Sequence, residues 1–166
     1  MDFALPPEIE DYRSRIRVFV ETHIMPLEAD RANYDDHENI RPDLLDDIRT
    51  RVKDAGLWAL QMPKDRGGQG LNVAGITPCY EEMNRSIFGP VCFNCAAPDD
   101  GNMTVLNKVG TDAQKERWLQ PIIDGQVRSA FAMTEPAPGS GSDPSAMLTT
   151  ATRKGDTWVV NGRKLF

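Results

Sequence analysis

Apolar residues recur at helical spacing along the first part of the chain. They form one stripe, made up of Ile9, Tyr12, Ile16, Phe19, Val20, His23 and Leu27. Residues three and four positions apart lie on the same face of an α-helix, so this stripe predicts an amphipathic helix from Pro7 towards Asp30. Pro26 lies inside the pattern and lacks a backbone N–H, so we expect the helix to kink or end near Met25.

The same spacing predicts further helices joined by short loops. A second helix contains Leu45, Ile48, Val52 and Ala55, with Pro42 near its start and Gly56 after its end. Other helices are expected over residues 73–85, 87–97, 99–109 and from Thr111 to beyond Ile122. Either Asp99 or Asp100 could cap the helix that precedes Gly110. Thr111 and Gln114 match the capping-box pattern of a helix start.

The periodicity changes after Gly125. Strands are predicted over residues 127–134, 147–153 and 157–160, with a turn at 154–156. Asn161-Gly162 is a strong hairpin signal, because both central positions of a type I′ turn need positive φ, and Arg163 to Phe166 would then return as a paired strand. The sequence therefore predicts a mainly α protein: a helical-bundle domain over residues 1–125, followed by an incomplete antiparallel β-domain over residues 126–166.

Charge and composition narrow the function classes. The chain has 25 acidic and 19 Lys or Arg residues, a net charge of -6, and no basic run that would neutralise phosphates, so no nucleic-acid partner is expected. No apolar run reaches the length of a membrane span, so no membrane insertion is expected. The N-terminal residues resemble neither a signal nor a transit peptide, which favours a cytoplasmic location.

Two short motifs could suggest ligand binding. Cys92 and Cys95 form a C-x-x-C pair, but a structural zinc site needs four ligands, and His23 and His37 have no spacing relation to them. We therefore predict buried thiols and no metal site. The loop Gly67-Gly68-Gln69-Gly70 lacks the Lys-Ser/Thr pair of a P-loop, so we interpret it as a turn.

Five longer motifs follow one another in order. They are Pro63 with Gly67-Gly68-Gln69-Gly70-Leu71, Glu81-Glu82 with Arg85, Gly110-Thr111 with Gln114-Lys115 and Trp118-Leu119-Gln120-Pro121, Phe131-Ala132-Met133-Thr134-Glu135-Pro136 with Gly141-Ser142-Asp143, and Asn161-Gly162-Arg163-Lys164. Each is weak alone, but together they resemble the acyl-CoA dehydrogenase family over essentially the whole chain. The resemblance implies the N-terminal helical domain of that family and the opening of its middle β-domain.

The resemblance also implies a cofactor, a substrate and a set of site residues. Members of the family bind FAD and oxidise the α,β bond of an acyl-CoA, with hydride passing to flavin N5. The flavin signature includes Phe131, and the backbone amides around Met133 and Thr134, with the Thr134 hydroxyl, would donate to the flavin. Gly141 and Ser142 would lie near the flavin pyrophosphate, and Ser142 would also contact the CoA portion of the substrate.

The loop after Pro136 is longer than the shortest family version. Ser140 is therefore an alternative to Ser142 as the residue whose hydroxyl contacts phosphate. The catalytic glutamate of the family comes from the helical domain after the β-domain, so we expect the base beyond Phe166 and predict no catalytic residue in this chain. Glu135 should alternate away from the flavin and act as a structural carboxylate.

These inferences favour the N-terminal fragment of an FAD-dependent acyl-CoA dehydrogenase that is inactive by itself and whose full-length form is a homo-oligomer. A non-catalytic helical interaction or scaffold fragment is one alternative. The N-terminal part of a related flavin enzyme, such as an acyl-CoA oxidase, is another.

Overall fold

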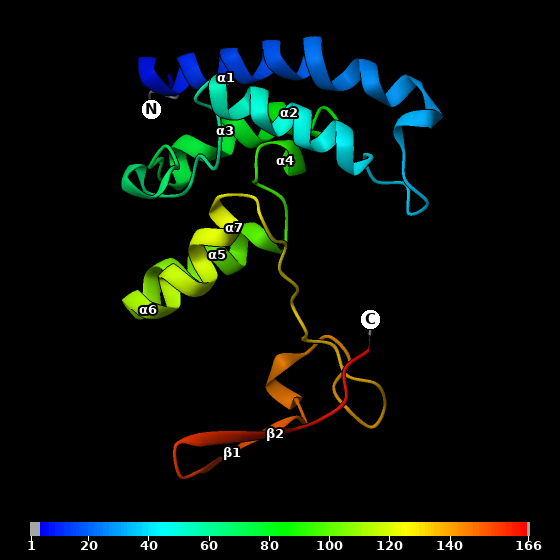
Figure 1. Cartoon of the computed structure of the whole chain (residues 1–166), viewed down its shortest axis with the longest axis vertical. Coiled ribbons are helices and arrows are strands. Elements are labelled where there is room, and N and C mark those ends of the chain that lie inside the picture. The colour runs from blue at the N-terminus through cyan, green and yellow to red at the C-terminus, as the bar shows by residue number, and fades with distance from the viewer. Residues whose placement is uncertain (1–3, 166) are drawn as a thin grey trace. The chain divides into compact units, whose positions relative to one another are not determined.

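A computed structural model describes residues 4–165 and divides between Ser129 and Ala130 into two compact units (Figure 1). We call residues up to Ser129 the helical unit and residues from Ala130 the C-terminal unit. Helices make up most of the first unit, and a single antiparallel strand pair lies in the second. This architecture confirms the predicted fold class.

The first helix changes its hydrogen-bonding pattern along its length, as expected near Pro26. α1 (Pro7–Phe19) continues as a π-helical segment, η1 (Val20–Ile24), and then as a 3₁₀ segment, η2 (Met25–Ala29). A proline cannot donate the hydrogen bond that a helix needs at its position, and the π-helical segment gives way to the 3₁₀ segment at Met25, directly before Pro26. The expected kink or end near Met25 is confirmed. A further 3₁₀ turn, η3 (Arg31–Asn33), follows.

The remaining helical elements begin and end largely at local signals. They are α2 (Pro42–Asp54), η4 (Lys64–Arg66), α3 (Val73–Met83), α4 (Gly89–Cys92), α5 (Asp99–Val109), α6 (Asp112–Gln114), η5 (Lys115–Leu119) and α7 (Gln120–Ile123). Pro42 occupies the first turn of α2, and Gly56 beyond its end has a φ of 66°. Thr111 and Gln114 form the predicted capping box. The π-helical segment η5 and α7 continue from α6, with Pro121 near the start of α7.

The predicted helix over residues 87–97 is wrong, because only Gly89–Cys92 is α-helical there. Asn94 adopts a positive φ of 58°, which turns the chain out of the helix. Its side-chain amide donates to the carbonyls of Ile122 and Ile123, at 3.0 and 3.2 Å. Asn94 thereby joins this segment to the end of α7, so a contact far along the sequence overrides the local apolar pattern.

The glycine loop after Pro63 is a tightly bonded turn. The Gly68 amide donates to the Pro63 carbonyl at 3.0 Å, and the Gly70 amide donates to the Met62 carbonyl at 2.7 Å. A Cβ on Gly68 would lie 2.2 Å from the Met62 carbonyl oxygen, so only glycine fits this backbone. Two of the loop's amides are thus used within the chain, as expected for a turn.

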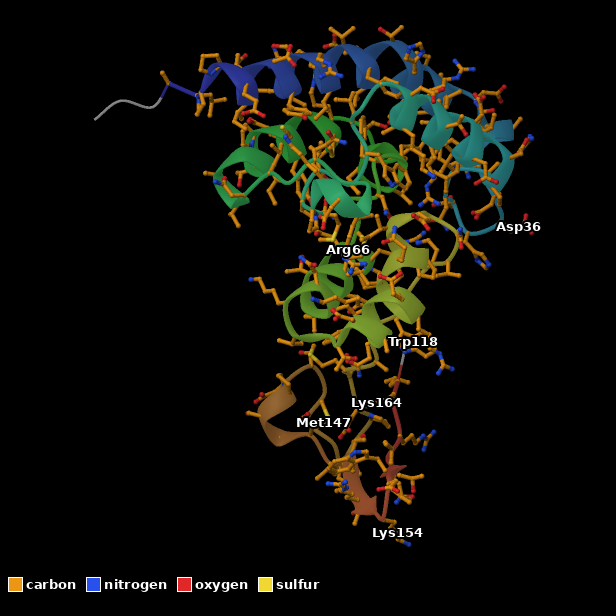
Figure 2. The ribbon with its side chains drawn as sticks, turned by 60° about the vertical axis from the view of Figure 1, so that its left-hand side comes forward. Asp36, Arg66, Trp118, Met147, Lys154 and Lys164 are labelled. Atoms are coloured by element: carbon orange, nitrogen blue, oxygen red, sulfur yellow. The ribbon has the colours of Figure 1, made fainter. Side chains whose placement is uncertain are left out.

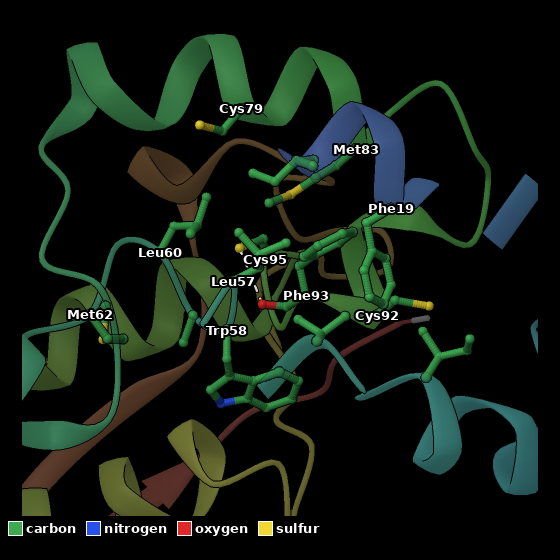
Figure 3. Close-up of a cluster of buried hydrophobic side chains, with 14 of the residues drawn as sticks. Phe19, Leu57, Trp58, Leu60, Met62, Cys79, Met83, Cys92, Phe93 and Cys95 are labelled. Atoms are coloured by element: carbon green, nitrogen blue, oxygen red, sulfur yellow. Dashed lines mark hydrogen bonds between the residues drawn. The ribbon is translucent and has the colours of Figure 1, made fainter. Parts of the chain in front are cut away.

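The hydrophobic core of the helical unit surrounds Phe93 (Figure 3). The Phe93 ring is fully buried and meets the Phe19 ring edge-on, with centroids 5.7 Å apart. The free thiols of Cys79, Cys92 and Cys95 are buried here, which confirms the prediction of buried thiols. Burial raises the pKa of Cys79 to about 11 and the pKa values of Cys92 and Cys95 to about 12.

A buried carboxylate joins α1 to α3. Glu82 accepts from the Nε atoms of Arg13 and Arg17, at 3.1 and 3.0 Å, and Arg85 lies 3.6 Å from it. The hydrogen bond from Arg17, followed by its charge and then by the bond from Arg13, lowers the pKa of Glu82 against the opposing effect of burial. Charged hydrogen bonds therefore fix how the two helices pack.

The C-terminal unit contains one hairpin. β1 (Thr150–Lys154) pairs antiparallel with β2 (Thr157–Asn161), from Thr150 opposite Asn161 to Lys154 opposite Thr157. The turn lies at Gly155 and Asp156, as predicted, and Gly155 has a φ of 60°. Lys154 marks this tip in Figure 2. A short 3₁₀ turn, η6 (Pro144–Ala146), precedes β1.

Two β-predictions are wrong. Residues 127–134 form no strand, because a strand needs a partner's backbone groups and none of the described residues pairs with this segment as a ladder. Asn161-Gly162 is not a type I′ turn, since neither residue has a positive φ. Gly162 is instead required by close approach: a Cβ there would lie 2.1 Å from Thr149 Oγ1. Residues 163–165 are not a strand and return towards Met133–Glu135.

Candidate functional site

The candidate site residues from Phe131 to Ser142 lie in the C-terminal unit. Phe131 is exposed, whereas Met133 and Thr134 are half-buried. The Glu135 amide donates to the Gly141 carbonyl at 3.0 Å, and an isolated antiparallel bridge joins these two residues. This bridge closes a short loop and brings the two parts of the motif side by side.

The backbone carbonyls of Met133 and Thr134 accept hydrogen bonds from within the C-terminal unit. Lys164 donates from Nζ to the Met133 carbonyl, and the Leu165 amide donates to the Thr134 carbonyl, both at 3.0 Å. By contrast, the amides of these two residues and the Thr134 hydroxyl have no acceptor among residues 4–165. The segment therefore holds its backbone rigidly on its carbonyl side and leaves hydrogen-bond donors available for a ligand.

Glu135 is the buried centre of this arrangement. Its carboxylate accepts from the amides of Leu148 and Thr149, at 2.7 and 2.9 Å, from the Thr149 hydroxyl, and from Lys164 Nζ at 3.0 Å. The Thr149 hydroxyl bond, with the other donors, lowers the pKa of Glu135 to about 2. All these donors belong to the protein itself, so the prediction of a structural carboxylate is confirmed.

The loop from Pro136 to Ser142 is compact and glycine-dependent. The Gly139 amide donates to the Pro136 carbonyl at 2.7 Å, and a Cβ on Gly139 would lie 2.6 Å from the Glu135 Cβ. Gly141 has a φ of 62°, and the space beside it is open. The hydroxyls of Ser140 and Ser142 have no partner among the described residues, so both are available to a ligand.

The expected capping role of Asp99 or Asp100 is wrong. The N-cap of α5 is Pro98, without a side-chain cap. Buried Asp99 instead accepts from Arg128 Nε at 2.6 Å and from the Ser129 amide and hydroxyl, both at 2.7 Å. Asp100 accepts from the Tyr80 hydroxyl at 3.1 Å, and burial raises its pKa. Each carboxylate accepts hydrogen bonds from another segment, and neither caps the helix.

The contacts of two basic residues were not predicted from the sequence. Lys164 was assigned to a hairpin arm, whereas its ammonium joins Glu135 to the Met133 carbonyl. Arg49 lies at the end of the apolar stripe of α2 and is buried beside Trp58. A charged residue next to Ile48 and four positions after Leu45 was the available signal, because such a position faces partly inward.

Other classes of site find no support in the described part of the chain. Over residues 4–165, no group of three or more His, Cys, Asp or Glu side chains could hold a metal ion. Among these same residues, no helix is both long and apolar enough to cross a membrane.

Known proteins resemble the chain closely. The family model for the acyl-CoA dehydrogenase N-terminal domain matches residues 6–126. The "Probable acyl-CoA dehydrogenase FadE2" of Mycobacterium tuberculosis is 41% identical over 99% of this chain and 40% of its own length. Acyl-CoA dehydrogenase family member 11 of Gallus gallus is 37% identical over 90% of this chain and 20% of its own length.

Solved structures that resemble the chain are also named as acyl-CoA dehydrogenases. A structure from Mycobacterium abscessus, also named as an acyl-CoA dehydrogenase, has a TM-score of 0.85 and 39% identity, covering 98% of this chain and 42% of that one. Butyryl-CoA dehydrogenase from Megasphaera elsdenii has a TM-score of 0.70 and 28% identity, covering 100% of this chain and 42% of that one. The chain thus spans less than half the length of these relatives. With its helical domain, its hairpin and the motif around Glu135, the chain belongs to the acyl-CoA dehydrogenase family.

Proposed function

We propose that this chain is the N-terminal part of an FAD-dependent enzyme that oxidises the α,β bond of an acyl-CoA. The main support is a set of unused hydrogen-bond donors at Met133 and Thr134. Lys164 and Leu165 fix the carbonyls of these two residues, whereas their amides have no acceptor among residues 4–165. Such fixed donors suit a ligand edge that becomes negatively charged during reduction. When bound, FAD would supply the acceptor for the hydride that leaves the β carbon.

Each residue of the C-terminal unit has a role in this proposal. The amides of Met133 and Thr134 and the Thr134 hydroxyl donate to the pyrimidine edge of the flavin, and Phe131 lies beside them. Gly141 permits close backbone approach to the flavin pyrophosphate, since the space beside it is open. Ser142 or Ser140 donates a hydroxyl to phosphate, and Ser142 also contacts the CoA portion of the substrate.

The proton chemistry needs a residue that this chain does not supply. A base must remove the α proton of the acyl-CoA, and Glu135 is unsuited because four hydrogen bonds from protein donors hold it ionised and buried. The base is proposed to lie in a polypeptide region that follows Phe166 in the complete enzyme. The names of the relatives support the reaction class: one neighbour is a butyryl-CoA dehydrogenase, and another is a glutaryl-CoA dehydrogenase structure in complex with FADH2.

A flavin titration tests the proposal. The purified chain is expected to bind FAD weakly or not at all, measured by flavin absorbance, and to form no enoyl-CoA from acyl-CoA. Where weak binding is measurable, Thr134→Ala should weaken it by about 2- to 10-fold, the value of one hydrogen bond. Thr150→Ala removes an exposed hydroxyl on β1 and should leave the affinity unchanged.

Two results would count against the proposal. Stoichiometric yellow protein with dehydrogenase activity would show that the chain needs no further region. Equal affinities of the Thr134→Ala and Thr150→Ala variants would exclude Thr134 from the flavin site.

A further inference from the structure

A cavity of about 750 Å³ lies within the helical unit and contains none of the residues of the flavin motif. Its walls come from α2, from the segment on both sides of α4, and from residues 125–128. α2 and α4 lie next to each other in Figure 1. The volume falls in the range of sites that bind small molecules, about 300–1,000 Å³. Nothing in the proposed flavin chemistry uses this space.

Arg49 is a buried cation in the wall of this cavity. Only 8% of its surface is exposed. Its Nε donates to the Val91 carbonyl at 3.2 Å, and its guanidinium carbon lies 5.6 Å from the centre of the Trp58 ring. These two contacts hold the guanidinium in place. Its Nη groups have no acceptor among residues 4–165, and no carboxylate in that range lies within ion-pairing distance.

A second cation, Arg128, lines the same cavity. Its Nε bonds to Asp99, while about half of its side chain remains exposed. Burial first, and the charge of Arg128 second, lower the pKa of Arg49. Asp99 is thus the only carboxylate in direct contact with either arginine among residues 4–165. No fully buried side-chain nitrogen among the described residues lacks a hydrogen-bond partner, so the unpaired Nη groups of Arg49 reach the open space of the cavity.

We propose that the cavity binds a small molecule through one compact oxyanion, a carboxylate or a phosphate, held by Arg49 and Arg128. The planar guanidinium of Arg49, already fixed by Val91 and Trp58, presents paired donors that match two oxygens of such a group. This inference stands apart from the proposed flavin function, and either can fail without the other.

Acidic residues restrict which anions fit. Asp35, Glu38 and Asp46 also line the cavity. Like charges repel at short range, so a ligand with several anionic groups would be disfavoured. The preferred ligand therefore has a single anionic group, and the remainder of the molecule is neutral or cationic.

Trp58 provides a direct readout. The other two tryptophans are exposed, Trp118 at 52% and Trp158 at 64%, so Trp118→Phe with Trp158→Phe leaves Trp58 as the sole fluorophore. This parent is titrated with inorganic phosphate, with acetate and with chloride at matched ionic strength. Saturable changes in Trp58 emission are expected with phosphate or acetate and not with chloride. The arm that saturates at lower concentration identifies the preferred oxyanion.

Variants that each remove one positive charge test which arginines bind the anion. Arg49→Gln in the same parent should weaken binding by about 10- to 100-fold, as expected for the loss of hydrogen bonds to a charged group. Arg128→Gln should weaken it several-fold. Arg51→Gln is the matched control, because Arg51 lies on the same helix, is half exposed and pairs with Asp47. Its affinity should equal that of the parent.

The proposal fails on any of three results. No greater change with phosphate and acetate than with chloride would assign Arg49 a different counter-charge, such as a carboxylate from another polypeptide region. Unaltered affinity in folded Arg49→Gln would also overturn it. If Arg49→Gln does not fold, Arg128→Gln decides: parental affinity in that variant overturns the proposal, and weakened affinity supports it.

Discussion

At the scale of single residues, the polar groups that matter in this chain take their roles from distant partners. Glu135 bonds to Leu148, Thr149 and Lys164, and Asp99 bonds to Arg128 and Ser129. The sequence placed Glu135 correctly as structural, because alternation along an extended segment turns it away from Thr134. The prediction that Asp99 could cap α5 was wrong. An aspartate at a helix start is an ordinary cap, and no local pattern indicated that Arg128 would bond to it.

Glu135 makes the C-terminal unit sensitive to acid. Its folded pKa of about 2 lies below the usual value for glutamate, about 4.3. A lowered pKa contributes stability that is complete above about pH 4.3 and is lost as the pH falls towards 2. The amides of Leu148 and Thr149 should therefore lose protection from hydrogen exchange over this window.

A matched pair of variants tests this pH dependence. Glu135→Gln should abolish the loss of protection between about pH 4.3 and 2, because the amide does not titrate there. Asp156→Asn, in the exposed hairpin turn, should keep it. Retention of the parental pH profile in Glu135→Gln would assign the effect to another carboxylate.

At the scale of elements, local signals predicted the ends of helices well. Pro26, Pro42, Gly56 and the Thr111 capping box all mark the boundaries or changes of type that were expected. Non-local contacts decided the exceptions. The segment after Cys92 leaves its helix because Asn94 bonds to the end of α7, and Gly162 serves a close contact instead of a turn.

The capping box should contribute measurably to the helix formed by α6, η5 and α7. The Thr111 hydroxyl accepts from the Gln114 amide at 3.3 Å, and the Gln114 side chain accepts from the Thr111 amide at 2.8 Å. Thr111→Ala should lower the free energy of unfolding by about 1 kcal/mol, measured by urea denaturation. Thr111→Ser, which keeps the hydroxyl, should lose much less. Equal losses in the two variants would show that the cap is not the cause.

At the scale of the whole molecule, the two units differ in how they are stabilised. Among residues 4–165, every buried hydrophobic side chain lies between Ile16 and Ile123, within the helical unit. All residues of β1 and β2 are exposed. A two-stranded hairpin whose apolar side chains, such as Trp158 and Val160, stay exposed is marginally stable in water. The C-terminal unit therefore depends mainly on the hydrogen bonds around Glu135.

This difference predicts separate opening of the two units. Amides in β1 and β2 should exchange with solvent at least about tenfold faster than those near Ile16 in α1 and Met83 in α3, because little apolar burial opposes opening of the hairpin. Hydrogen exchange followed by mass spectrometry or NMR measures this directly. Equal protection in both units would mean that the hairpin is held by contacts of similar strength to the helical core.

The sequence by itself determined the family, the mainly α class and the position of most helix ends, because these depend on motifs and on residues close together in the chain. Only the tertiary structure decided the partners of Glu135, Asp99 and Asn94, the absence of a strand over residues 127–134, and the burial of Arg49 beside Trp58. Each of these depends on groups distant in sequence, and no local pattern specifies which distant donor or acceptor folding will bring near.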